Sequence, residues 1–114
     1  MADCIFCKIL KREIPSTIIF EDSETVVFKD INPQAPVHLL VVPKKHLPSL
    51  DDCTAADEAL LGHVFSVARD VAHRHGLKPS GYRIILNTGE GAGQSVFHIH
   101  FHLLGGRPLS WPPG

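Results

Sequence analysis

The sequence predicts an α+β fold: a five-stranded antiparallel sheet with one long helix and a short N-terminal helix. Two observations lead to this prediction. The β-rich runs are segregated from a single long helical pattern instead of alternating with it, which favours an antiparallel sheet. Proline and glycine divide the 114 residues into short elements, without an internal repeat or a low-complexity linker. Residues 1–114 are therefore expected to form one domain.

The first half of the chain is expected to supply the short helix and three strands. Phe6, Ile9 and Leu10 mark the helix or turn near the N-terminus. The strands are expected in the runs rich in β-branched and aromatic residues, at 18–20, 26–28 and 37–42. The first two runs flank a polar turn and predict a hairpin, and two prolines in segment 32–36 exclude regular structure before the third run.

The second half is expected to supply the long helix and two more strands. Thr54 and Asp57 have the spacing of a capping box, and apolar residues then recur at helical spacing until Gly76. Residues 82–87 predict a fourth strand and residues 96–104 a fifth, separated by a glycine-rich segment.

Composition excludes several classes of function. Eleven Lys and Arg against 12 Asp and Glu give a formal net charge of −1, so no basic field is available for a nucleic-acid polymer or an anionic membrane. No apolar run is long enough to span a bilayer, and the N-terminus lacks the pattern of a signal peptide. Three cysteines, an odd number, disfavour a disulfide framework. We therefore expect a cytoplasmic protein with no membrane or nucleic-acid partner.

Three of the eight histidines alternate within a single apolar run. On a strand, His98, His100 and His102 would share one face, while the intervening apolar residues would share the other. Histidines on one flat strand do not easily converge on one metal, because same-face Cβ atoms lie about 7 Å apart. A zinc protein with histidine ligands is nevertheless one interpretation of the run.

Phosphoryl chemistry is the other interpretation. The glycines before the run allow the backbone to approach an anion and present N–H groups to it, and Ser95 adds a hydroxyl. A neutral imidazole beside such a loop can attack phosphorus and form a covalent intermediate.

Four segments carry a resemblance to a known family. The run GQSVFHIHFHLL at 93–104 resembles the histidine-triad pattern His-φ-His-φ-His-φ-φ, in which φ is apolar. FKDINPQAPVH at 28–38, VVPKKH at 41–46 and GGRPLSWPPG at 105–114 resemble the histidine-triad nucleotide-binding (HINT) branch of that superfamily. The resemblance implies a two-fold dimer that hydrolyses purine nucleoside phosphoramidates, with AMP or GMP derivatives as substrates and no metal in catalysis.

The resemblance also implies roles for individual residues. The nucleophile would be His100, within a catalytic group completed by His102, His98, His38 and Ser95. Phosphate and ribose contacts would come from Asp30, Asn87, Gly93, Ser95 and Val96. The purine slot would be formed by Phe6, Ile9, Phe28 and Ile31. Trp111 would reach the active site of the partner subunit.

A metal site is the remaining expectation. Cys4 and Cys7 have the spacing of half a zinc site, and they resemble the microbial histidine-triad proteins in which His46 would be a third ligand. His98 is the candidate fourth ligand. Such a closed site would hold structural zinc, with two reduced thiols as the alternative.

Two other functions fit the same residues. One is a dinucleoside polyphosphate hydrolase, which the triad run does not distinguish from a phosphoramidase. The other is a nucleotide-binding regulatory module in which turnover is incidental. The ending WPPG favours the phosphoramidase.

Overall fold

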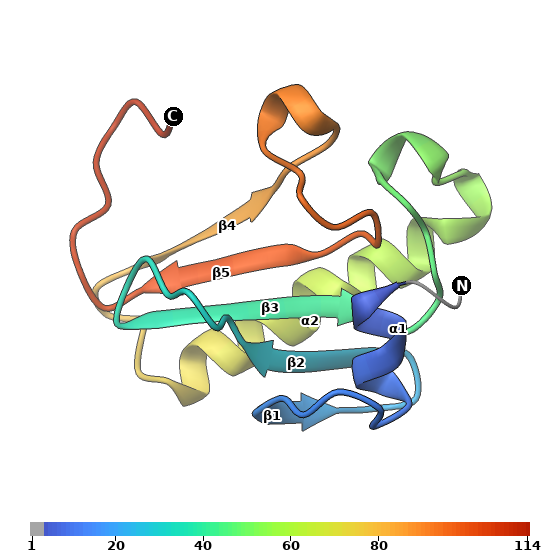
Figure 1. Ribbon diagram of the computed structural model, residues 1–114. Helices are drawn as coiled ribbons and strands as arrows, with labels where there is room; N and C mark the ends of the chain where they lie inside the picture. The colour runs from blue at the N-terminus through green and yellow to red at the C-terminus, as the bar shows by residue number, and fades with distance from the viewer. Residues whose placement is uncertain (1–3) are drawn as a thin grey trace.

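The fold is a five-stranded antiparallel sheet with a helix on each face, seen in a computed structural model that describes residues 4–114. The sheet order is β1-β2-β3-β5-β4. The strands are β1 (Ile18–Glu21), β2 (Thr25–Lys29), β3 (Val37–Pro43), β4 (Tyr82–Leu86) and β5 (Phe101–Gly105). The helices are α1 (Ile5–Leu10) and α2 (Glu58–Arg74), and short 3₁₀ turns occupy Leu50–Asp52, Ala55–Asp57 and Glu90–Ala92. The predicted α+β class is confirmed (Figure 1).

Alternation along the strands divides the core into two layers. Leu39, Val41 and Leu103 face α2, in a cluster that includes the buried helix residues Val64 and Val71. The opposite face carries a smaller cluster, in which residues of α1 cover β2 and β3: Phe6, Ile9, Val26, Phe28, Leu40 and Val42. α2 therefore stabilises one side of the sheet, and the short helix α1 only partly covers the other.

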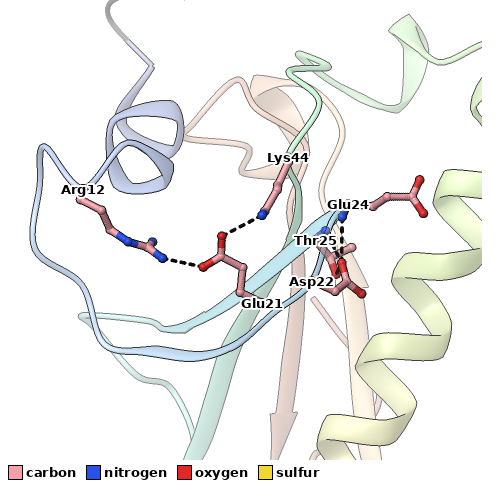
Figure 2. Close-up of polar contacts among 6 residues, drawn as sticks. All are labelled: Arg12, Glu21, Asp22, Glu24, Thr25 and Lys44. Carbon is pink, nitrogen blue, oxygen red and sulfur yellow. Dashed lines mark hydrogen bonds and ion pairs between the residues drawn. The ribbon is translucent and has the colours of Figure 1, made fainter.

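The predicted hairpin is confirmed, and its turn is fixed by Asp22. The Oδ1 atom of Asp22 accepts hydrogen bonds from the N–H groups of Glu24 and Thr25 and from the Thr25 hydroxyl (Figure 2). These bonds lower the pKa of Asp22 well below its ordinary value, although burial opposes them. They specify the turn through side-chain bonds to the backbone.

Glu21 ties the α1 face of the sheet to the segment after α1. Its carboxylate accepts hydrogen bonds from Lys44, at the end of β3, and from Arg12, in the turn that follows α1 (Figure 2). The Lys44 and Arg12 bonds together lower the pKa of Glu21. α1 is thus connected to the sheet by ionic contacts at its C-terminal end.

α2 begins as the sequence predicts. Thr54 caps the 3₁₀ turn that leads into the helix, and the capping box with Asp57 is present. The helix ends at Arg74, just before Gly76, whose φ of 73° suits glycine. None of the helices within residues 4–114 has the length and hydropathy needed to cross a membrane.

The last strand differs from the prediction. β5 begins at Phe101, whereas the sequence predicts a strand from residue 96. The ladder with β3 stops at Val41 and Phe101, close to Pro43, which has no N–H to continue it. Instead, the N–H of Ile99 donates to the carbonyl of Leu47 at 2.7 Å. His98 and His100 therefore lie in an irregular segment, and only His102 lies on the strand.

Candidate active site

A cavity of about 350 Å³ opens on the α1 face of the sheet. Its volume lies at the lower end of the range found for small-molecule sites, about 300–1,000 Å³. The predicted site residues that line it are Phe6, Ile9, Phe28, Asp30, Ile31, Ser95, Val96, His100 and His102. Residues from α1, β2 and the segment before β5 thus meet around one space.

One end of the cavity is apolar and the other is polar. The rings of Phe6 and Phe28 pack edge to face with centroids 5.4 Å apart, and Phe6 also lies 5.0 Å from the ring of His100. Ile31 is 98% exposed, so it forms part of the rim. The carboxylate of Asp30 and the imidazoles of His100 and His102 supply polar groups to the lining. This polarity suits a ligand with a flat apolar part and an anionic part.

Several lining residues were missed by the sequence reasoning: Ile5, Ile14, Pro15, Ser16, Lys29 and Leu40. Leu40 was accessible from the pattern, because it lies two residues after His38 on β3 and so shares its face. Ile14, Pro15 and Ser16 belong to the segment after α1, and no local pattern predicts that it folds over the cavity.

Five of the residues predicted to be catalytic or to bind substrate do not line this cavity: His38, His98, Asn87, Gly93 and Trp111. His38 and His98 instead make contacts with other histidines and with the cysteines. Asn87 follows the end of β4, and Gly93 closes a 3₁₀ turn with a φ of 93°. Trp111 is 81% exposed, near the C-terminal end of the chain. The predicted contacts of Asn87, Gly93 and Trp111 with substrate stay predictions.

Hydrogen bonds define the proton positions on His38 and His102. The N–H of Gln34 donates to Nδ1 of His38 at 3.0 Å, so that nitrogen carries no proton. In the neutral ring, Nε2 of His38 must then carry the proton, and it lies 2.9 Å from Nδ1 of His102. His102 therefore accepts at Nδ1 and holds its own proton at Nε2. This arrangement leaves an N–H donor on a ring that lines the cavity.

His100 has the opposite tautomer. Its Nδ1 lies 2.8 Å from the carbonyl oxygen of His98 and must donate to it. The lone pair is left on Nε2, and the ring lines the cavity. Among the described residues 4–114, the site therefore combines one imidazole whose Nε2 lone pair has no hydrogen-bond partner, at His100, and one whose Nε2–H has none, at His102.

Burial keeps these imidazoles neutral at pH 7. It lowers the pKa of His38 and of His100 below the ordinary value, although the nearby Asp30 carboxylate opposes the change. Burial, together with the neighbouring His100 and His38, lowers the pKa of His102 to about 4, although the Asp30 carboxylate opposes the change. A neutral imidazole is the form that can act as a nucleophile.

These shifts predict a loss of stability in mild acid. Below pH 6.5 the unfolded chain binds protons at His38 and His102 more readily than the folded chain does, so the free energy of unfolding decreases as the pH falls from 6.5 to 5. Urea titrations at pH 7 and pH 5 should show a smaller decrease for His102→Gln than for the unsubstituted protein. The matched control is His73→Gln, in an exposed position on α2. An equal decrease in both variants would contradict the assignment.

A second cluster lies behind the cavity and brings together all four predicted metal ligands. Cys4, Cys7 and His46 are half-buried around the buried His98. Nδ1 of His98 lies 3.4 Å from Sγ of Cys4, 3.6 Å from Sγ of Cys7 and 3.1 Å from Nδ1 of His46. Sγ of Cys7 lies 3.5 Å from Nδ1 of His46.

The distances fit a tetrahedral zinc ion. Zn–S bonds of about 2.3 Å and Zn–N bonds of about 2.0–2.1 Å require ligand atoms roughly 3.3–3.8 Å apart, close to the observed separations. Nε2 of His98 lies 2.7 Å from the carbonyl oxygen of Pro43, to which it donates, so its Nδ1 lone pair faces the cluster. Such a backbone bond is the usual support for a metal-ligating imidazole.

Asp30, His38 and His102 form another group of atoms within 4.8 Å of one another. The two imidazole nitrogens that would have to bind the metal already bond to each other, because the proton on Nε2 of His38 is donated to Nδ1 of His102. A metal there would have to break that bond, so this group fits proton positioning better than metal binding.

α1 connects the cavity with the cysteine cluster. Sγ of Cys4 caps the helix by accepting from the N–H of Cys7, so both thiols lie at its N-terminal end. Phe6 and Ile9, on the same helix, are buried and line the cavity. The position of this wall of the cavity therefore depends on the residues around the cluster.

Comparison with known proteins finds similar sequences along nearly the whole chain. A family model described as "Scavenger mRNA decapping enzyme C-term binding" matches residues 3–108. An uncharacterised HIT-like protein of Synechocystis sp. is 54% identical over 112 residues, which cover 98% of this chain and 97% of that protein.

Solved structures agree with the sequence matches. A HIT family hydrolase from Legionella pneumophila is 49% identical, with a TM-score of 0.97 over 98% of this chain and 100% of that chain. A histidine triad nucleotide-binding protein from Candida albicans is 34% identical, with a TM-score of 0.83 over 96% of this chain and 83% of that chain.

Proposed function

The chain belongs to the histidine-triad (HIT) superfamily, and on that premise we propose that it hydrolyses purine nucleoside phosphoramidates through a nucleotidyl-histidine on His100. The observation that carries the proposal is the tautomer of His100, whose Nδ1 donates to the carbonyl of His98. The lone pair on Nε2 is then available to phosphorus in the cavity.

The reaction has two displacement steps. Nε2 of His100 attacks phosphorus and forms an N–P bond, while the P–N bond of the substrate breaks and the departing amine takes a proton from solvent. Water then attacks phosphorus, the N–P bond to His100 breaks, and the proton of the water is released with the nucleoside monophosphate. The N–H at Nε2 of His102 donates to a phosphoryl oxygen in both steps and stabilises its growing negative charge.

The remaining cavity residues are assigned to substrate binding. Phe6, Ile9, Phe28 and Ile31 would enclose the purine. Asp30 would accept hydrogen bonds from the ribose hydroxyls. Oδ1 of Asp30 accepts from the N–H of Asn32 at 2.8 Å, which fixes the orientation of the carboxylate. Ser95, Val96, Asn87 and Gly93 would bind the phosphate and the sugar.

We also propose that Cys4, Cys7, His46 and His98 hold a structural zinc ion. Zinc would cross-link α1 to the segment after β3, through His46, and to the segment before β5, through His98. Four protein ligands complete the coordination, so no position is open for substrate and no catalytic step needs the metal.

A homodimer is part of the same proposal. The exposed apolar side chains include Phe65 on α2 and Trp111 near the C-terminus, at 50% and 81% exposure. A second copy would cover such surface, and the C-terminal segment would then bring Trp111 to the partner's cavity.

The proposed activity is tested by turnover of an adenosine 5′-phosphoramidate. We expect release of AMP and amine at least tenfold faster than cleavage of a dinucleoside polyphosphate. Addition of a chelator should cause no immediate change in the rate. The assay should use full-length protein in parallel with His100→Ala.

The alternatives give different results. Faster cleavage of the dinucleoside polyphosphate would indicate a polyphosphate hydrolase. Tight AMP binding without turnover of either substrate would indicate a regulatory module. Immediate inhibition by the chelator, with the fold intact, would indicate zinc in the chemistry.

A further inference from the structure

The segment after β5 holds the loop between β2 and β3 by two contacts. Nε and Nη2 of Arg107 both donate to the carbonyl oxygen of Gln34, at 3.1 and 2.9 Å. Beside this contact, Gly106 packs against Pro36: a Cβ on Gly106 would lie 2.9 Å from Cβ of Pro36, and φ of Gly106 is 92°. One contact is electrostatic and the other is steric, and both act on the loop that contains Gln34.

Gln34 is also the residue that determines the tautomer of His38. Its N–H donates to Nδ1 of His38 at 3.0 Å, so the proton of His38 is on Nε2 and bonds to His102. Gln34 is exposed and makes a further bond, from Nε2 to the carbonyl of Asn32, within its own loop. Arg107 is therefore the contact that fixes the carbonyl of Gln34 to the segment after β5.

We propose that Arg107 is a positioning residue for catalysis. By bonding to the Gln34 carbonyl, it orients the Gln34 N–H toward Nδ1 of His38. His38 then donates from Nε2 to Nδ1 of His102, so the proton of His102 stays on Nε2. The role of that proton rests on the proposed function, since Nε2–H of His102 is the donor to the phosphoryl oxygen.

The chemistry of arginine suits this task. Two donors of the planar guanidinium converge on one carbonyl oxygen, and such charge-assisted bonds are stronger than neutral ones. Lysine has a single flexible ammonium and cannot reproduce the two-donor geometry. We therefore expect Arg107→Met to disturb the tautomers of His38 and His102 more than Arg107→Lys does.

The test reads the tautomers directly. Long-range ¹H–¹⁵N NMR correlations of the imidazole rings show which nitrogen of His38 and His102 carries the proton, without substrate. We expect protons at Nε2 of both rings in the unsubstituted protein and a mixture of tautomers in Arg107→Met. With a purine nucleoside phosphoramidate as substrate, the kcat of Arg107→Met should be about five- to tenfold lower than that of the unsubstituted protein, with little change in KM. A decrease of this size is expected from the loss of one hydrogen bond.

Three further variants complete the design. Arg107→Lys should show an intermediate effect on both measurements, and it preserves the charge if Arg107→Met is poorly folded. Gly106→Ala should displace Pro36 and reproduce the Arg107→Met spectrum. Arg69→Met is the matched control, because Arg69 is exposed on α2 and its one ion pair within residues 4–114 is with the neighbouring Asp70.

The outcomes separate this inference from the proposed function. Unchanged tautomers in Arg107→Met, or changed tautomers with an unchanged kcat, would overturn the positioning role. If the unsubstituted protein does not turn over the phosphoramidate, the proposed function fails, and the NMR spectra alone then decide whether Arg107 orients His38.

Discussion

His100→Ala is expected to reduce the turnover of a purine nucleoside phosphoramidate by about four orders of magnitude or more. The substitution removes the only atom that would bond to phosphorus, and a ten-thousandfold loss corresponds to about 5.4 kcal/mol of transition-state stabilisation. Binding of AMP should change less than tenfold, because Phe6, Phe28 and Asp30 still line the cavity. Single-turnover kinetics and AMP titration measure the two effects separately.

The covalent intermediate gives a second measurement of the same prediction. Rapid quenching of the unsubstituted protein under alkaline conditions should trap an acid-labile nucleotidyl adduct, and peptide mass spectrometry should locate it on His100. His73→Ala is the control, since His73 is exposed on α2. Near-normal turnover by His100→Ala, or an adduct on another residue, would rule out the assigned nucleophile.

Loss of the metal site is expected to have the largest effect on stability. Purified protein should contain about one zinc per chain, and Cys4→Ser with Cys7→Ser should remove it. A ligand that binds only the folded state stabilises that state, so the free energy of unfolding should fall by about 3 kcal/mol or more. For a domain of this size, the melting temperature should fall by roughly 10 °C or more.

The same double variant should raise KM more than it lowers kcat at temperatures below its melting point. α1 carries Cys4 and Cys7 together with Phe6 and Ile9, so release of the metal loosens one wall of the cavity. Cys53→Ser is the control, because Cys53 bonds to the carbonyl of Ser49 instead of joining the cluster. A metal-free protein with unchanged stability would leave Cys4 and Cys7 as packing thiols.

Local patterns in the sequence were sufficient to predict most of the fold. The hairpin and the start of α2 were found because Asp22 and Thr54 bond to backbone groups a few residues away. The start of β5 was predicted too early, because the apolar alternation continues through residue 100 while the partner strand ends at Pro43. Where a strand ends depends on its neighbour in the sheet, which lies far away in the sequence.

The candidate site was predicted less completely. The pattern of alternating histidines implied one shared face, whereas the structure sends the His98 ring to the cysteine cluster and the His100 and His102 rings to the cavity. The resemblance supplied His38 and the purine slot. Nothing in the sequence indicated that Gln34 and Arg107 meet, because their contact joins a loop and a chain end separated by two-thirds of the chain.

The sheet order has a consequence for the sequence of events in folding. β5 is the last strand to be synthesised, yet it lies between β3 and β4, and β4 pairs only with β5. During translation β1, β2 and β3 can pair as they emerge, whereas β4 must wait for β5. Long-range pairings of this kind are slow to form. Because β5 and the segment before it carry His98, His100 and His102, the sheet and the site are completed together, and a nascent or truncated chain that ends before residue 98 has neither the complete sheet nor the site.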